Sequence, residues 1–301
     1  MSEVTLRLSI VGAGRVGQTL GKLLFDANAC DVAQVFSRGG AAASQAVHFI
    51  GTGKPILSLS EFDLSPENGP DVLLITVPDD AIEPIAMQIA ELHTDLSGIT
   101  VLHCSGSMTA DALRPLQILG AGTASVHPIK SFSDPATAVR TFVGTYCSVE
   151  TGQADSRSIV TDLFRRIGGE TFDLSSDVKP LYHTAIVLVC NYLYTLLHMG
   201  LETLEAAGIA GEIAMAAIEP IMHETVTNGV RLGPGKALTG PIVRGDINTI
   251  VKQISQLNEH LPQFSDAYRE LGKVTAQLAR ADASLSGESF AAIVAALDDR
   301  D

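Results

Sequence analysis

Apolar side chains in the first half of the chain fall into short runs that alternate with segments of helical periodicity. The run from Leu6 to Val11 carries no charge after Arg7, which is typical of a strand buried on both faces of a parallel sheet. From Arg15 onward apolar residues recur every three or four positions, which predicts a helix directly after the strand. The chain is therefore expected to open with a strand, a short turn and a helix.

The same alternation continues to about residue 175. It predicts a doubly wound, mostly parallel α/β sheet of about eight strands in residues 1–175. A proline and two aspartates at 78–80 are expected to end one strand and to cap the next helix. The other predicted strands are 31–36, 55–59, 71–77, 99–104, 122–126, 142–149 and 170–174, and the other predicted helices are 41–50, 82–92, 113–119 and 155–167.

Residues 176–301 show helical periodicity only, which predicts an all-helical second domain for substrate binding and dimerisation. Its first helix, capped by Ser176 or Asp177, should run to about residue 207. Because this helix is apolar nearly all round, we expect it to be buried, against a second subunit of a homodimer. Its most apolar part, 185–197, is too short to span a bilayer. The later helices are predicted at 210–228, 248–257, 264–281 and 290–297, with a glycine-rich connection at 229–240.

The turn after the first strand reads Gly12-Ala13-Gly14-Arg15-Val16-Gly17 and fits the G-x-G-x-x-G pattern of dinucleotide-binding proteins. Gly12 would allow the tight turn, Gly14 would let the backbone approach a pyrophosphate, and Gly17 would let the helix pack closely on the strand. The helix that opens with Arg15 and Val16 would point its free N-terminal amides at the phosphates. A glycine-rich turn without a ligand is the alternative.

The end of the second predicted strand indicates which dinucleotide is bound. No carboxylate stands where it would bind the ribose 2′-hydroxyl of NAD, whereas Ser37 and Arg38 could hold a 2′-phosphate. The sequence therefore predicts NADP, unless Arg38 is only a solvated surface arginine.

Further candidate residues follow the carboxyl ends of the central strands, where ligands of open α/β sheets bind. Val77 and Pro78 are expected to line the cofactor crevice, with Asp79 and Asp80 acting first as helix caps. Ser105 and His127 both stand just past strand ends, and His127 is a candidate for proton transfer at neutral pH. A histidine that only bonds a loop carbonyl is the alternative. Lys130, in the same loop, is a candidate substrate ligand.

In the helical half, His183 and Asn191 lie on the first helix and could border one cleft, although a core or interface role for His183 is nearly as plausible. The segment Thr239–Asp246 combines a turn, a helix start and Arg244, which would suit a carboxylate or a phosphate. The alternative is a turn in which Arg244 pairs with Asp246. We therefore count Thr239 and Arg244 as candidate substrate ligands.

The charge and composition of the chain limit the classes of molecule that it could bind. The 46% hydrophobic content is typical of a soluble globular protein, and the net charge of −14 disfavours nucleic acid and anionic membranes. The four cysteines show no metal or disulfide spacing, and the first strand starts too early for a signal peptide, so we expect a cytoplasmic protein. No metal site is predicted, because the His198–Glu202 and His223–Glu224 pairs lack a third ligand.

Taken together, the segments GAGRVG, VPDDAI, HCSG, VHPIKSF, YHTAIVLVCNYL and TGPIVRGD resemble a bacterial family in which a Rossmann-like domain precedes a domain of unknown function. That family is similar to pyrroline-5-carboxylate reductases, prephenate dehydrogenases and the 6-phosphogluconate dehydrogenase superfamily, whose helical C-terminal domain we expect here. The resemblance to prephenate dehydrogenases implies active-site roles for Ser105 or Ser107, His127 and His183. The lysine–asparagine pair of hydroxyacid dehydrogenases is incomplete, since Lys179 has no asparagine four residues later. Thr239–Asp246 resembles the helix start that reductases supply from a second subunit.

The sequence thus predicts an NADP(H)-dependent oxidoreductase that acts on a small, carboxylate-bearing substrate with a C=O/C–OH or C=N/C–NH pair. His127 would exchange the proton, Ser105 and Asn191 would orient the reacting group, and Arg244 would hold the anionic end. The alternatives are an NADP-binding regulatory or scaffold protein without catalysis, and an enzyme whose partner is a deazaflavin coenzyme.

Overall fold

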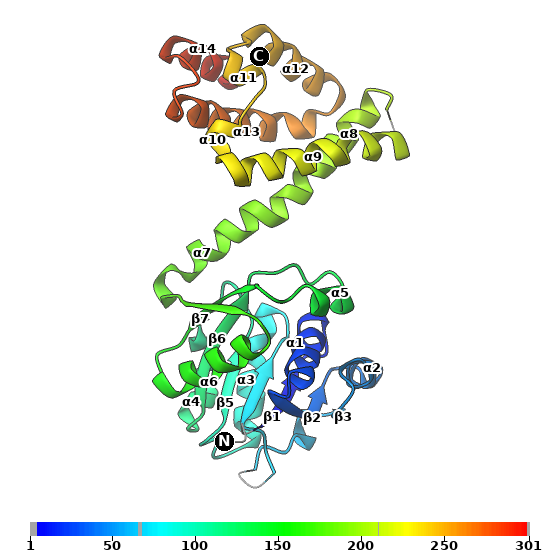
Figure 1. The fold of residues 1–301 in the computed structure, drawn as a ribbon, viewed down its shortest axis with the longest axis vertical. Coiled ribbons are helices and arrows are strands. Elements are labelled where there is room, and N and C mark those ends of the chain that lie inside the picture. Colours follow the sequence, from blue (N-terminus) through cyan, green and yellow to red (C-terminus); the bar gives the residue numbers. More distant parts are fainter. Residues whose placement is uncertain (1–4, 66–67, 210, 300–301) are drawn as a thin grey trace. The chain divides into compact units, whose positions relative to one another are not determined.

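A computed structural model describes residues 5–65, 68–209 and 211–299. The contacts divide the chain into two compact units, residues 1–189 and residues 190–301, which are described separately here. The first unit holds the sheet, together with the start of the long helix that the sequence predicted after residue 175 (Figure 1).

The first unit is built on one eight-stranded sheet with the order β3-β2-β1-β4-β5-β6-β7-β8. All neighbouring strands are parallel except β7, which runs antiparallel to β6. The doubly wound, mostly parallel sheet predicted from the sequence is therefore confirmed. The strands are β1 (Leu6–Val11), β2 (Cys30–Phe36), β3 (Lys54–Ile56), β4 (Val72–Ile75), β5 (Thr100–His103), β6 (Gly122–Pro128), β7 (Tyr146–Glu150) and β8 (Glu170–Asp173).

Alternate residues of the central strands belong to different hydrophobic clusters, as expected for a sheet covered on both faces. In β4, Val72 and Leu74 join one cluster, whereas Leu73 and Ile75 join the other. The α-helices of this unit are α1 (Arg15–Asp26), α2 (Gly40–Ile50), α3 (Asp79–Leu92), α4 (Arg114–Ile118), α5 (Pro135–Arg140), α6 (Ala154–Arg166) and α7 (Lys179–Ile186), and the 3₁₀ turns are η1 (Leu59–Glu61), η2 (Ala110–Leu113) and η3 (Ser176–Val178).

The second unit is helical throughout its described residues and has a core of its own. Ile250, Ile254, Ala276, Ile293 and Leu297 lie at the centre of this core, where α12, α13 and α14 pack together. The helices are α8 (Tyr192–Ala206), α9 (Glu212–Leu232), α10 (Pro234–Ala237), α11 (Pro241–Arg244), α12 (Ile247–His260), α13 (Pro262–Ala281) and α14 (Gly287–Asp298).

The long helix has nearly its predicted length but is not regular throughout. It spans Ser176–Ala206 and changes to π-helical turns at Val187–Asn191. In the single chain it is exposed, with Val189 and Tyr194 each about two-thirds accessible, and its burial against a second subunit stays a prediction. By length and composition this one helix, among the described residues, could cross a membrane.

Several predicted boundaries were wrong for local reasons. Within the predicted glycine-rich connection, residues 229–232 continue α9 and residues 234–237 form α10, and α11 begins directly after it. Phe142 precedes β7 in a turn, although its side chain is fully buried as in a strand. Neither Ser176 nor Asp177 caps the long helix, because the hydroxyl of Ser176 donates to Glu150 instead.

Candidate functional site

The turn between β1 and α1 is closed at two glycines by neighbouring backbone. Gly12 has a φ of +109°, and a Cβ there would lie 2.6 Å from the carbonyl oxygen of Thr76. A Cβ at Gly17 would lie 2.2 Å from the carbonyl oxygen of Gly12. The hydroxyl of Thr76 donates to this same carbonyl over 2.7 Å, which ties the turn to the end of β4. Side chains are therefore excluded from both positions by the turn itself.

Gly14 is different, because a Cβ there would meet nothing within 4 Å. It is the N-cap of α1, and no side chain among the described residues caps this helix. Arg15 and Val16 form the first positions of α1, so its first amides and its positive dipole end are available to an anion. This open corner is the arrangement that a dinucleotide pyrophosphate requires.

The corner opens into a cavity of about 340 Å³, whose walls come from the turn and from the ends of β2 and β4. Arg38 is exposed there and makes no hydrogen bond or ion pair with any described residue. The predicted cofactor residues that line this cavity are Gly12, Gly14, Ser37, Arg38, Val77 and Pro78. The residues present thus fit a dinucleotide with a further anionic group beside Arg38.

The loop after β5 is held from both sides by hydrogen bonds. Ser105 and Ser107 each donate a hydroxyl proton to the same oxygen of Asp79, both over 2.8 Å, which gives this aspartate a role other than capping. On the sheet side, the fully buried His103 accepts from the backbone amide of Ser105 and contacts the carbonyl of Thr109. Burial lowers the pKa of His103 to about 4, so this side chain is neutral near pH 7.

His127 lies near the end of β6, and its Nδ1 is 2.8 Å from the hydroxyl of Tyr182 on α7. Burial, reinforced by His183 and Lys179, lowers the pKa of His127 to about 4, although Asp79 acts in the opposite direction. The loss of hydration lowers the pKa of His127 by more than the attraction of the Asp79 carboxylate raises it. His127 is therefore neutral at physiological pH.

A second imidazole stands beside the first. The rings of His127 and His183 are 5.5 Å apart and nearly perpendicular. A Cβ at Gly106 would lie 2.2 Å from Nδ1 of His183 and 2.9 Å from Nε2 of His127, so both nitrogens face the same point of the loop after β5. Nδ1 of His183 is buried and has no hydrogen-bond partner among the described residues. The structure thus brings together two of the predicted catalytic residues, with Ser105 next to Gly106.

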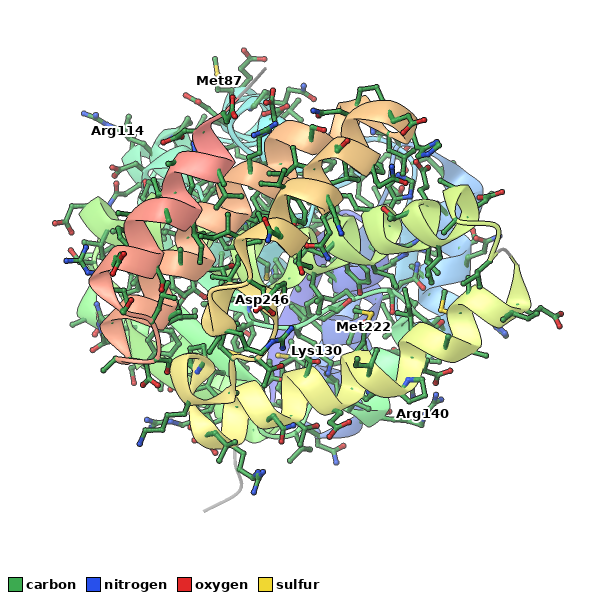
Figure 2. The ribbon with its side chains drawn as sticks, turned by 90° about the horizontal axis from the view of Figure 1, so that it is seen from above. Met87, Arg114, Lys130, Arg140, Met222 and Asp246 are labelled. Atoms are coloured by element: carbon green, nitrogen blue, oxygen red, sulfur yellow. The ribbon has the colours of Figure 1, made fainter. Side chains whose placement is uncertain are left out.

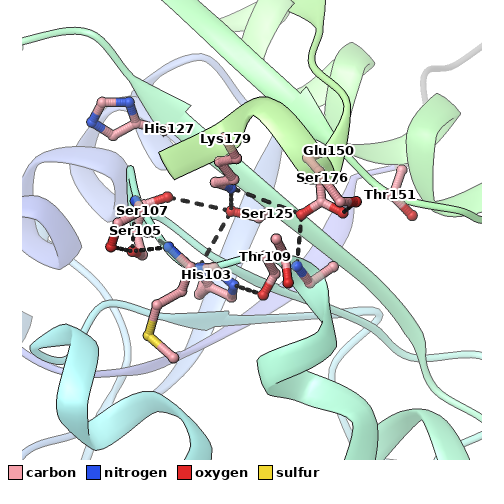
Figure 3. Close-up of polar contacts among 12 residues, drawn as sticks. His103, Ser105, Ser107, Thr109, Ser125, His127, Glu150, Thr151, Ser176 and Lys179 are labelled. Carbon is pink, nitrogen blue, oxygen red and sulfur yellow. Dashed lines mark hydrogen bonds and ion pairs between the residues drawn. The ribbon is translucent and has the colours of Figure 1, made fainter. Parts of the chain in front are cut away.

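Lys179 begins α7 and is fully buried against β6 and β7, in the network of Figure 3. Its ammonium donates to the hydroxyl of Ser125 and lies 3.8 Å from Oε2 of Glu150. Glu150 also accepts from the amide of Ala110 over 2.6 Å and from the hydroxyl of Ser176 over 2.7 Å. Burial lowers the pKa of Lys179 to about 8, against the opposing attraction of Glu150. Lys179 is therefore anchored inside the first unit.

The other predicted site residues are engaged locally. Lys130 donates to the carbonyl of Thr141 over 2.7 Å. Arg244 donates to Asp246, which Figure 2 labels, over 2.8 Å, and this is the pairing that the sequence left open as an alternative. Thr239 precedes α11 and Asn191 ends the π-helical turns, both in the second unit. Their roles toward a substrate stay predictions.

Sequence reasoning missed Tyr182, Ser125, Glu150 and His103 as parts of this site. Ser125 carried a usable signal, since it stands two residues before His127 and must share its face of the strand. Glu150 carried none, because its place depends on the antiparallel register of β7. Among the described residues, no group of three or more histidine, cysteine or acidic side chains is placed to hold a metal.

Comparisons with known proteins agree with this architecture. Residues 1–128 match the Rossmann-like domain, and residues 145–275 match the domain of unknown function DUF2520. The chain has no match among curated proteins.

Solved structures share the fold along nearly the whole chain. A candidate NADP oxidoreductase from Bacteroides fragilis is 19% identical, with a TM-score of 0.74 over 91% of this chain and 98% of that one. A reductive aminase from Aspergillus terreus in complex with NADPH is 13% identical, with a TM-score of 0.60 over 97% and 92%. The prephenate dehydrogenase of Aquifex aeolicus is 16% identical, with a TM-score of 0.52 over 91% and 96%. The combination of a Rossmann-like domain with DUF2520 that the sequence motifs indicated is confirmed, and the solved structures confirm the fold.

Proposed function

Because the chain carries a Rossmann-like domain followed by the DUF2520 domain, we propose that it is an NADP(H)-dependent oxidoreductase acting on a small substrate with a C=O/C–OH or C=N/C–NH pair. The observation that carries this proposal is the common location of the two site components. The open glycine corner follows β1, and the His127–His183 pair stands at the end of β6, at the same carboxyl edge of one sheet. The solved relatives with NADP or NADPH in their descriptions support the cofactor class.

Separate residues of the chain would bind the cofactor and transfer the proton. The α1 amides bind the diphosphate, and Ser37 and Arg38 bind the 2′-phosphate. When bound, the nicotinamide supplies or accepts the hydride. His127 hydrogen-bonds to the heteroatom of the substrate and exchanges its proton, and the unpartnered Nδ1 of His183 provides a second polar contact. Ser105, Asn191, Thr239, Lys130 and Arg244 remain proposed substrate ligands, with Arg244 expected to release Asp246 for a carboxylate.

The central experiment mixes purified protein and NADPH with panels of keto acids, imines and hydroxy acids, and follows nicotinamide absorbance. With an active substrate, His127→Ala should lose about 10²- to 10⁴-fold in kcat while NADPH affinity is unchanged. His198→Ala, at an exposed histidine paired with Glu202, is the matched control and should keep full activity. Tight NADPH binding without turnover of any compound would favour the regulatory alternative.

Cofactor choice is tested separately. Arg38→Asp should shift binding from NADPH toward NADH, because a carboxylate repels the 2′-phosphate and can accept from a 2′-hydroxyl. Arg114→Asp is the control at another exposed arginine. Unchanged selectivity in the Arg38 variant would overturn the NADP assignment without affecting the oxidoreductase proposal.

We also propose that the protein is a cytoplasmic homodimer in which a second copy covers the exposed apolar side chains of the long helix. Leu188, Val189, Tyr192, Tyr194 and Leu196 are all exposed in the single chain, which is unusual for a helix of this apolarity. Light scattering should give twice the chain mass, and Tyr194→Glu should reduce it to one. Val143→Glu, at a still more exposed valine before β7, should leave the dimer intact. A monomeric wild-type protein would contradict this proposal.

A further inference from the structure

Helix α7 docks on the sheet through two adjacent cross-strand pairs. In the antiparallel register of β6 and β7, Ser125 lies opposite Glu150 and His127 lies opposite Ser148. Lys179 contacts the first pair, and Tyr182, almost one helical turn later, contacts His127 of the second. Ser125 and His127 are two residues apart on β6, and their partners Lys179 and Tyr182 are three residues apart on α7. Each of the two helix residues therefore contacts a different cross-strand pair.

The direction of the hydrogen bond between Tyr182 and His127 decides which ring nitrogen carries the proton. The Ser148 hydroxyl is fully buried and has no hydrogen-bond partner among the described residues. Burial raises the pKa of the neighbouring Tyr182, and Ser148 acts against this rise. If Tyr182 donated toward Ser148, the serine proton would be left buried without an acceptor, which is costly. If Ser148 points its proton at Tyr182 and Tyr182 donates to His127 Nδ1, both hydroxyl protons have an acceptor. The second direction is therefore favoured.

We propose that Tyr182 is a positioning residue that donates to Nδ1 of His127, fixes this histidine as its Nε2–H tautomer, and relays a proton through it to the substrate. The proposal rests on the proposed function, because it specifies how His127 exchanges the proton there. Nε2 of His127 faces Gly106, where a side chain would meet this nitrogen at 2.9 Å.

The relay balances without a charged histidine. As the substrate carbon takes up hydride, the electron pair of its C=O or C=N bond moves to the heteroatom. The heteroatom then takes the proton from Nε2 of His127, while Nδ1 receives the phenolic proton of Tyr182. Tyr182 is left as a phenolate and His127 as its Nδ1–H tautomer. After the product leaves, a solvent proton binds Nε2 while the proton on Nδ1 returns to the phenolate, which restores the starting state. In the oxidation direction the same protons move in reverse.

The electrostatics of the site favour such a relay over proton donation by a charged histidine. With its pKa lowered to about 4, His127 holds no second proton near pH 7 and could not act as an imidazolium acid. The titratable groups that face it are Tyr182, His183 and Lys179 on α7 and Asp79 on α3, and burial raises the pKa of Tyr182, so this residue enters each cycle as the phenol. A neutral His127 can still donate one proton per turnover, because the hydrogen-bonded Tyr182 supplies a proton to its other nitrogen.

The first test requires neither cofactor nor substrate. Nitrogen NMR of the full-length protein labelled in histidine distinguishes the two tautomers, and His127→Gln assigns the resonance. We expect Nε2–H in the wild type and a mixture of tautomers in Tyr182→Phe. A wild-type spectrum that shows Nδ1–H, or an unchanged tautomer in the variant, would overturn the proposal even if the protein proved to be an oxidoreductase.

The second test uses turnover with any substrate found active. Tyr182→Phe should lower kcat by about 10²- to 10⁴-fold, the usual range for a placed proton donor, with KM and NADPH affinity unchanged. Tyr146→Phe removes the hydroxyl of an exposed tyrosine on β7 and should change neither the NMR spectrum nor kcat. Normal kcat in Tyr182→Phe would refute the relay. Absence of turnover in every variant including wild type would instead refute the proposed function.

Discussion

Replacing Lys179 by methionine tests whether the buried polar network holds α7 on the sheet. The change removes the cation but keeps most of the side-chain volume, so Glu150 would remain 4% exposed without its ionic partner. Removing one member of a buried ion pair costs about 3–5 kcal/mol, because the other charge stays desolvated. Two hydrogen bonds, from Ala110 and Ser176, still reach Glu150 and place the expected loss near the lower limit.

Calorimetry of the full chain would measure this loss. A cost of about 3 kcal/mol should lower the melting temperature of the sheet-containing unit by about 6–12 °C for its size. Lys22→Met is the matched control, since Lys22 contacts Asp26 over only 2.7 Å but at the surface, where such a pair contributes at most about 1 kcal/mol. The buried pair is longer, at 3.8 Å, so the comparison separates burial from distance.

The double variant Lys179→Met with Glu150→Gln should recover part of the loss, because no uncompensated charge remains. If Lys179→Met cost no more than Lys22→Met, or if the two substitutions in the network were simply additive, the network would not be the anchor of α7.

Three further outcomes follow from the geometry. Gly17→Ala should destabilise the protein by about 1–3 kcal/mol in urea unfolding because its Cβ meets the Gly12 carbonyl at 2.2 Å, whereas Gly14→Ala should fold normally and weaken NADPH binding in a calorimetric titration; equal stability losses would contradict this. Gly106→Ala should lower kcat by at least about tenfold with NADPH affinity unchanged, because its Cβ displaces both imidazoles; full turnover would be incompatible with their roles. Since the folded-state pKa of His103 lies near 4 and the unfolded value near 6.5, its stabilising contribution is complete above pH 6.5 and falls by about 3 kcal/mol on acidification to pH 4. In pH-dependent unfolding, His103→Gln should lack this part of the acid loss, and an identical pH slope in the two proteins would refute the assignment.

The sequence predicted best where structure depends on neighbouring residues. Six consecutive residues define the glycine corner, and the alternation of apolar strands and helices is a local pattern that survives in the folded sheet. His127 and Ser105 could be predicted because residues at the end of a buried strand stand at the sheet's carboxyl edge, although β6 extends two residues further than predicted and includes His127.

Residues placed by long-range register could not be found in this way. Glu150 faces Ser125 only because β7 runs antiparallel, and a strand's direction has no signature in its own apolar pattern. Tyr182 precedes the predicted His183 and could not be singled out, since adjacent helical residues differ by about 100° and only the docked helix shows which one hydrogen-bonds to His127. The apolarity of the long helix was noticed, but hydrophobicity alone does not say what will cover it.

The two contacts that α7 makes with the sheet form and break together. Lys179 and Tyr182 reach the sheet from the same short helix, so fraying of that one segment would hydrate the ammonium and free the imidazole together. A partially unfolded chain therefore could not retain a correctly protonated His127. Catalysis would be confined to molecules in which α7 is docked on the sheet.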